Sequence, residues 1–229
     1  ANTSFLGEAK ISFVAWDRTT GGNGAVVSVG TRGGTTAYST DFDYAAISIV
    51  NAAPVLNDAG SPTFEGILPN VPDVNNPGTL VSTLIGRMSP AGGITDANPY
   101  ALRGIAVIGK SGAGIWEYST NNGSTWSTLN STSAANATLL ASDTNSRIRY
   151  LPAANVVGEA KIAFVAWDQS TGTSGAVVNA STRGGTTAFS TAYEYASIFV
   201  NTAPTLDASG TPTLDSISNT ISDAANVGT

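Results

Sequence analysis

The sequence predicts an all-β fold made of tandem repeats. Three observations support this prediction: short runs of alternating residues separated by Gly, Asn, Ser and Pro, the near absence of helical periodicity, and a long internal repeat. The chain has 229 residues, of which 41% are hydrophobic, so it is long enough to bury at least one large β core.

The internal repeat is the strongest of these observations. Residues 7–17 (GEAKISFVAWD) return 151 positions later as residues 158–168 (GEAKIAFVAWD), with ten of eleven positions identical. The sequence TRGGTTA of residues 31–37 returns unchanged at residues 182–188. The repeating unit is therefore about 150 residues long.

The joint between units is expected at the Asn-x-Ala-Pro sequences of residues 51–54 and 201–204, because proline disfavours helix before it and cannot extend a central strand. The chain then divides into three parts. Residues 1–50 are the C-terminal part of a preceding repeat, residues 51–200 are a complete repeat, and residues 201–229 are the N-terminal part of a following repeat. We expect such a chain to be part of a longer protein. In the alternative, partial units complete one another between molecules and build a fibre by strand addition.

Alternating residues identify the strands inside the complete repeat. Both alternating sets of residues 160–168 are apolar, which is typical of an interior strand, and residues 193–199 are expected to pair with it. Asn122-Gly123 predicts a tight hairpin turn, because both residues tolerate positive φ. Further strands are predicted at Thr79–Ile85, Ala101–Ile108, Gly114–Thr120, Thr125–Leu129, Thr138–Ala141 and Arg147–Leu151.

The number of strands indicates the kind of all-β fold. Seven to nine strands in about 150 residues are typical of an immunoglobulin-like or cadherin-like β-sandwich, so we expect tandem sandwiches of this type. The Gly-, Ser- and Thr-rich stretch between Trp167 and Thr191 is longer than an ordinary hairpin loop. It is expected either to form an extra β-ribbon or to carry function.

Composition excludes several classes of function. The net charge is −6, and the seven Arg and three Lys are scattered, so nucleic acid is not an expected partner. The chain has no Cys and no His, which removes Ser-His and Cys-His nucleophile pairs and tetrahedral zinc sites, and we expect no enzyme activity. No apolar run approaches the length of a membrane span.

Several short sequences of the complete repeat resemble a known kind of protein. They are the Ala-Pro-x-Leu that opens the unit, GIAV at 104–107, WEYST at 116–120, RIRY at 147–150 and AWD at 166–168. Residues 53–200 look like one of the long cadherin-like and immunoglobulin-like repeats of giant bacterial surface proteins, found beside RTX-type adhesins. The resemblance implies an extracellular or cell-surface location, a sandwich fold, and linkers often stiffened by calcium. With it, we expect a spacer or adhesive role in a surface coat or fibre, with neighbouring repeats of the same protein as partners.

Calcium requires several oxygen ligands from carboxylates, amides and carbonyls. The candidate ligands lie near the joint and in the turns: Asp58, Glu65, Asp73, Asp96, Asn98, Asp143 and Asp168. Where related arrays carry adjacent acids at the joint, this chain has Phe64-Glu65-Gly66, which departs from their pattern. In the alternative interpretation, these side chains form turns by accepting hydrogen bonds from nearby backbone amides.

An aromatic cluster supports a second hypothesis from a different functional class. Trp116, Tyr118 and Trp126 flank the predicted hairpin turn and could form a platform on which surface glycans stack, as in a carbohydrate-binding module. Burial of these aromatic side chains in the core is the alternative.

Overall fold

The computed structural model describes residues 6–88, 93–131, 133–214 and 216, and in this part the chain is all-β with several antiparallel sheets. The strands are β1 (Gly7–Trp16), β2 (Tyr38–Ile49), β3 (Val55–Leu56), β4 (Thr79–Leu80), β5 (Ile94–Thr95), β6 (Gly104–Ser111), β7 (Gly114–Ser119), β8 (Ser127–Thr128), β9 (Ala137–Ala141), β10 (Arg147–Pro152), β11 (Gly158–Trp167), β12 (Val177–Val178) and β13 (Phe189–Val200). The all-β prediction is confirmed.

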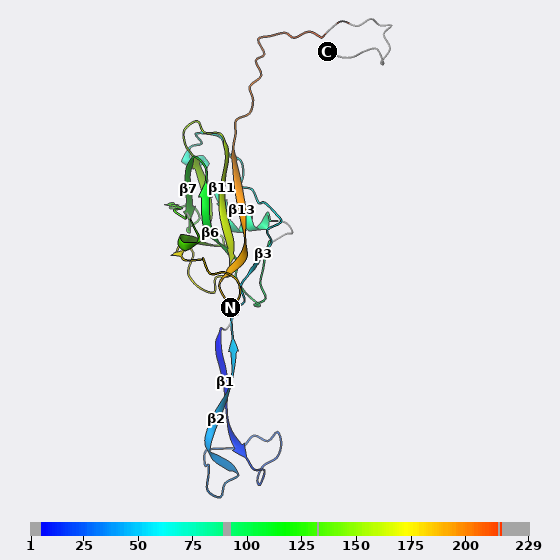
Figure 1. The fold of residues 1–229 in the computed structure, drawn as a ribbon, viewed down its shortest axis with the longest axis vertical. Helices are drawn as coiled ribbons and strands as arrows, with labels where there is room; N and C mark the ends of the chain where they lie inside the picture. Colours follow the sequence, from blue (N-terminus) through cyan, green and yellow to red (C-terminus); the bar gives the residue numbers. More distant parts are fainter. Residues whose placement is uncertain (1–5, 89–92, 132, 215, 217–229) are drawn as a thin grey trace.

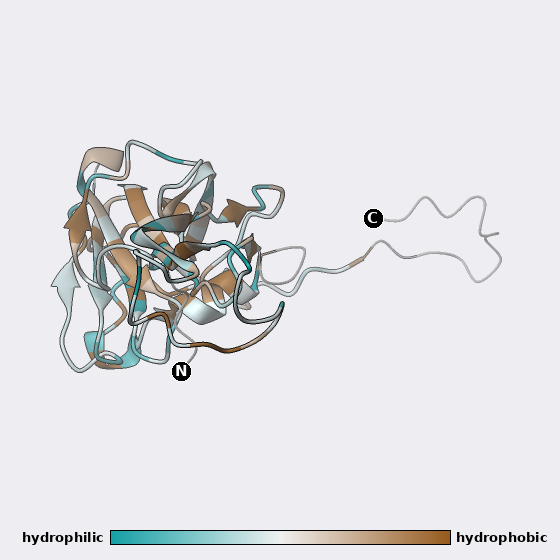
Figure 2. Cartoon of the chain, turned by 90° about the horizontal axis from the view of Figure 1, so that it is seen from below, coloured by the Kyte–Doolittle hydropathy of each residue, from teal (hydrophilic) through white to brown (hydrophobic). Residues whose placement is uncertain are grey.

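Residues 51–200, which we name the body, contain two larger sheets. One has the strand order β12-β9-β6-β11-β13 and the other β4-β10-β7-β8. One hydrophobic cluster draws side chains from both sheets, including Phe164 of β11 and Trp116 of β7. A second cluster contains Leu139 and Trp167. Several strands of the body are hydrophobic, and hydrophilic colouring gathers in loops, although some loop segments are hydrophobic as well (Figure 2).

The end of the repeat forms what we name the closing hairpin, β11 and β13. β11 pairs with β6 on one side and with β13 on the other, so it is the interior strand that its two apolar faces predict. The loop between β11 and β13 contains β12, which pairs with β9. The long Gly-rich loop thus contributes an extra strand, one of the two expected outcomes.

The beginning of the repeat covers the outer edge of the closing hairpin. Residues 62–67 run parallel to the end of β13, with isolated bridges from Thr63 to Ser197 and from Ile67 to Val200. The Phe64 amide donates to the Ser197 carbonyl at 2.8 Å, and Phe64 itself packs into the core. The first and last segments of the repeat are therefore held together in one body.

One predicted strand is wrong. Residues 79–85 form only the short strand β4, followed by helix α1 (Val81–Gly86). Val81, Leu84 and Ile85 are buried on one side of this helix, at the spacing that a helix requires. Two 3₁₀ turns, η1 (Asp73–Asn75) and η2 (Ala134–Asn136), are the other helical elements of the described residues.

β1 and β2 form what we name the N-terminal hairpin. It projects from one end of the body, and the chain beyond Val200 leaves at the opposite end (Figure 1). Within the described residues, β1 and β2 pair only with each other. In the same part of the chain, no helix is long and apolar enough to span a membrane.

Candidate functional site

Asn51, at the expected start of the complete repeat, forms hydrogen bonds with the loop between β11 and β13 near the end of the same repeat. Its Nδ2 donates to Asp168 Oδ2 at 2.6 Å and to the Thr187 carbonyl at 3.0 Å. The Ala53 amide donates to the Gly185 carbonyl at 2.9 Å. Residues 51–53 are thereby tied to the loop between β11 and β13 where the N-terminal hairpin meets the body.

Asn98 holds the same segment from a second side. Its Oδ1 accepts the Ala52 amide at 2.6 Å, and its own amide donates to Asp96 Oδ1 at 2.7 Å. Three of the predicted calcium ligands, Asp96, Asn98 and Asp168, thus lie around the segment that opens the repeat. We name this group, with Asn51, the joint cluster.

The joint cluster offers a cation few free oxygens. Asp168 is buried, and both of its oxygens accept hydrogen bonds, from Asn51 and from the Ser170 amide. Oδ2 of Asp96 is buried and has no hydrogen-bond partner within the described residues. Across those residues, no group of three or more acidic side chains is spaced to hold a metal ion. Among the carboxylate oxygens of the joint cluster, Asp96 Oδ2 is therefore the one without a hydrogen-bond partner in the described residues.

The other predicted calcium ligands are separated from the joint cluster and from one another. Glu65 forms an ion pair with Arg87, and Asp73 Oδ2 lies 3.4 Å from Arg149 Nη2. Asp143 Oδ1 accepts the amides of residues 145 and 146, and Asp58 lies in an exposed turn. In these positions the acidic side chains make ion pairs or turns.

The copy of Asp168 in the first repeat behaves as a turn former. Asp17 Oδ1 accepts the Thr19 amide at 2.8 Å and the Thr19 hydroxyl at 2.7 Å. These hydrogen bonds, first that of the amide and then that of the hydroxyl, favour the ionised carboxylate and hold the pKa of Asp17 below its usual value.

The aromatic residues of the carbohydrate hypothesis do not form one exposed platform. Trp116 is only 1% exposed and packs against Phe64 and Tyr150, with ring centroids 5.4 and 4.9 Å away. Tyr118 donates its hydroxyl to the Gly175 carbonyl at 3.3 Å. Trp126 lies beneath the Arg149 guanidinium, 4.2 Å from the ring centroid. A sugar ring has no access to Trp116.

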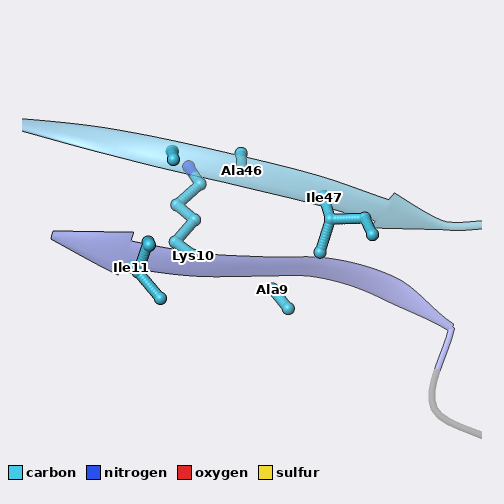
Figure 3. Close-up of a pocket in the computed structure, with 6 residues that line it drawn as sticks. Ala9, Lys10, Ile11, Ala46 and Ile47 are labelled. Atoms are coloured by element: carbon cyan, nitrogen blue, oxygen red, sulfur yellow. The ribbon is translucent and has the colours of Figure 1, made fainter.

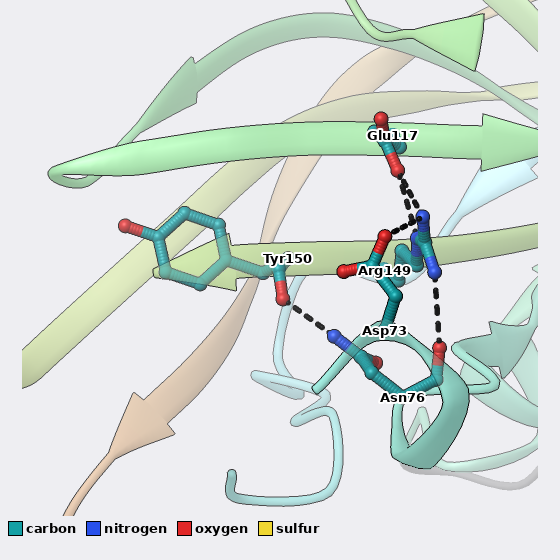
Figure 4. A network of polar contacts seen from close by, with 5 residues as sticks. All are labelled: Asp73, Asn76, Glu117, Arg149 and Tyr150. Carbon is teal, nitrogen blue, oxygen red and sulfur yellow. Dashed lines mark hydrogen bonds and ion pairs between the residues drawn. The ribbon is translucent and has the colours of Figure 1, made fainter. Parts of the chain in front are cut away.

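Arg149 is the centre of a polar network (Figure 4). Its side chain is 7% exposed, and it donates from Nε to Glu117 Oε2 at 2.8 Å and reaches Asp73 and the Asn76 carbonyl. The Asn76 amide group donates to the Tyr150 carbonyl at 2.8 Å. This network joins η1 to β7 and β10, which is a structural role that sequence reasoning missed.

A buried acid, Glu194, also escaped the sequence prediction. Glu194 on β13 is 6% exposed; its Oε1 accepts the Tyr195 amide, and its Oε2 has no hydrogen-bond partner in the described part of the chain. The available signal was its position in the alternating pattern, on the same face of the strand as Ala196 and Ile198.

The N-terminal hairpin exposes an apolar face. Ile11, Phe13 and Ile47 are 68%, 50% and 65% exposed. An open depression of about 250 Å³ is lined by Ala9, Lys10, Ile11, Ala45, Ala46 and Ile47. Ala9, Ile11 and Ile47 extend to one side of the hairpin, and Lys10 and Ala46 extend to the other (Figure 3). Isolated apolar side chains are common on protein surfaces, whereas a contiguous exposed apolar face of this kind is a candidate interaction surface.

The equivalent positions of the closing hairpin are buried. Ile162, Phe164 and Ile198, which match Ile11, Phe13 and Ile47 in register, are 0%, 0% and 4% exposed. A similar contrast is found on the other face near the loop. Trp167 and Ala180 are buried there, whereas Val29, at the position that matches Ala180, is exposed. The exposed apolar face of the N-terminal hairpin therefore corresponds to the face that the closing hairpin buries in the core.

An exposed aromatic pair is common to both hairpins. Tyr193 and Tyr195 are 48% and 47% exposed, with centroids 5.6 Å apart in an edge-to-face arrangement. Phe42 and Tyr44 repeat this arrangement at 5.4 Å. This pair points outward whether or not the hairpin belongs to a complete body.

No family model, curated protein or solved structure matches the chain.

Proposed function

We propose that the chain is a structural or adhesive repeat module of a large extracellular bacterial surface protein, serving as a spacer, coat or fibre element. The observation that carries the proposal is the recurrence, within one chain, of the hairpin that ends the repeat, with its strand pairing and its register irregularity preserved. A unit repeated in this way suits a role in which length and stiffness matter.

The fold within this proposal is an immunoglobulin-like or cadherin-like β-sandwich. The four-stranded and five-stranded sheets contribute to one hydrophobic cluster, with Ile148 from one sheet and Ile162 from the other. Two antiparallel sheets with a shared core are the basis of such sandwiches. The residues 53–200 that resemble long bacterial surface repeats are also those that build both sheets.

Small-angle scattering tests the spacer role. The chain is expected to give an elongated particle, and a recombinant tandem of two copies of residues 51–200 is expected to be nearly twice as long as one copy. The joint cluster is the reason, since it fixes the start of each unit against its own loop. A compact globule for the tandem would contradict the spacer role.

Calcium stiffening of the joint is part of the proposal, and it is supported by the buried, unpartnered Asp96 Oδ2. Calcium that binds only the folded state raises the thermal unfolding temperature by linkage. We expect such a rise in millimolar calcium, its reversal by chelator, and its loss in Asp96→Ala, whereas Asp58→Ala in the exposed turn keeps it. An unfolding temperature that is the same with calcium and with chelator would remove calcium and leave the fold proposal intact.

Adhesion to surface glycans is a second candidate, favoured by the aromatic pair of Tyr193 and Tyr195. Exposed tyrosine rings stack on sugar faces, and this pair recurs as Phe42 and Tyr44 in the first hairpin. A glycan array should then show binding that Tyr193→Ala weakens and that Tyr100→Ala, at another exposed tyrosine, leaves unchanged. An array without any binding would eliminate this candidate.

A further inference from the structure

The closing hairpin shows what normally covers a hairpin of this sequence. One edge of β11 pairs with β6 in an antiparallel register that places Val165 opposite Ala106 and Trp167 opposite Gly104. The outer edge of β13 is covered by residues 62–67. The inner edge, the end of the outer edge and the core face of the closing hairpin are therefore covered by the first two-thirds of its own repeat.

The N-terminal hairpin keeps the strand pairing that this cover contacts. Its strands pair in the same register as β11 and β13, with the same irregularity between Val14 and Trp16 as between Val165 and Trp167. In both hairpins a serine hydroxyl accepts the amide at the irregularity, Ser39 from Ala15 at 2.9 Å and Ser190 from Ala166 at 2.8 Å. The backbone of the first hairpin is already shaped for docking.

The side chains of the apolar face are also the same or similar in the two hairpins. Ala9, Ile11, Phe13 and Ala15 are identical to the buried Ala160, Ile162, Phe164 and Ala166. On the second strand, the buried Ala196, Ile198 and Val200 correspond to Ala45, Ile47 and Ile49. A face that stayed in water would gain nothing from keeping these residues apolar.

Resting on the proposed repeat function, we infer that the N-terminal hairpin is a docking surface for the opening two-thirds of a further repeat, a segment with the sequence pattern of residues 51–157. A strand of the β6 type adds to the edge of β1, with its counterpart of Ala106 opposite Val14 and its counterpart of Gly104 opposite Trp16. The counterparts of Leu56 and Phe64 fill the depression beside Ile11 and Ile47.

The C-terminal segment of a second copy does not supply this cover. Residues 201–214 match residues 51–64 and provide Leu206 and Leu214 where the complete repeat has Leu56 and Phe64. Residues 51–64 include part of the segment that lies along the end of β13, whereas the strand that pairs with the edge of β11 is β6. In a second copy, the C-terminal segment could run along β2 as residues 62–67 run along β13. The edge of β1 and most of the apolar face would then remain uncovered.

A spliced chain tests the inference. Residues 51–157 are placed directly before Gly7 of the chain, which reproduces the natural junction between Val157 and Gly158. Amide hydrogen exchange of residues 10–16 should then slow by about 100-fold or more relative to the 229-residue chain, toward the rates of residues 161–167, because these amides become part of a cooperative core.

Two variants of the spliced chain control for unspecific protection. Phe13→Ala removes a side chain from the docked face and should restore fast exchange in residues 10–16. Tyr44→Ala changes the face that is exposed in both hairpins and should leave the protection in place. Equal exchange of residues 10–16 with and without the added segment would overturn the inference, as would protection that Phe13→Ala does not change.

The 229-residue chain supplies the remaining arm. Its residues 10–16 should exchange rapidly at all protein concentrations; slow exchange that appears on concentration and disappears when residues 201–214 are deleted would assign the surface to a second copy and overturn the inference. Scattering of the spliced chain separates this inference from the proposed function. Protected amides in a compact particle would support docking and contradict the spacer role. Unprotected amides in an elongated particle would support the spacer role and contradict docking.

Discussion

The two hairpins of this chain have nearly the same sequence and very different surroundings. Ile11 is 68% exposed and its counterpart Ile162 is 0% exposed, although both lie in strands with the same register. Strand pairing and turn shape are thus determined within about 45 residues, whereas burial depends on segments a hundred residues away. Comparison of the two hairpins therefore distinguishes the local contributions, which set the strand pairing, from the long-range contributions, which set the burial.

Truncation of the matched phenylalanines should give the largest difference. Phe164→Ala removes a fully buried ring and is expected to destabilise the body by about 3–5 kcal/mol, from lost transfer free energy and the cavity left behind. Phe13→Ala removes a half-exposed ring and should change the free energy of unfolding of the body by less than about 0.5 kcal/mol. Urea unfolding followed by tryptophan fluorescence measures both.

Two further substitutions define how this result is interpreted. Tyr193→Ala and Phe42→Ala, at equivalent exposed positions, should both be nearly neutral. If Phe13→Ala destabilised the 229-residue chain as much as Phe164→Ala, the first hairpin would already have a packed core.

The joint aspartates should give an intermediate difference. Asp168→Ala removes a buried acceptor of hydrogen bonds from Asn51 and Ser170, and we expect a loss of about 1–3 kcal/mol. Asp17→Ala removes an exposed turn former and should leave the urea midpoint of the body unchanged. A neutral Asp168→Ala would mean that the hydrogen bond from Asn51 contributes nothing to the stability of the repeat.

The matched loop glycines should show no difference. Gly33 and Gly184 have φ values of 75° and 76°, and an added Cβ would meet the hydroxyl of Thr40 or Thr191. Alanine at either position should therefore destabilise its own loop by about 1–2 kcal/mol. Amide exchange of residues 31–37 and 182–188 reports this. An effect confined to Gly184→Ala would show that the loop shape depends on the body.

The strands of the closing hairpin were predictable from the sequence because their signal is local. The two apolar faces of β11 predicted an interior strand, and the structure places it between β6 and β13. Asn122 and Gly123 predicted a tight turn, and both have positive φ. Residues 79–85 were mistaken for a strand because their β-branched residues hid the helical spacing of Val81, Leu84 and Ile85.

The joint cluster was less predictable, because its members come from distant parts of the chain. Asp168, Asp96 and Asn98 were selected for their oxygens, but the partner of Asp168 is Asn51, which lies 117 residues away. No periodicity connects such positions. The burial of Glu194 and Arg149 was missed for the same reason: each depends on what packs against its strand.

The parallel contact between residues 62–67 and the end of β13 has a consequence for synthesis. The Asn201 amide donates to the Ile67 carbonyl. The contact between residues 62–67 and the end of β13 therefore includes the first residue of the next repeat. On a ribosome, which releases the N-terminus first, the early segment must wait for more than a hundred residues before this contact forms, and long-range closure of this kind is slow. An array of such repeats would grow with one unfinished unit always nearest to the ribosome.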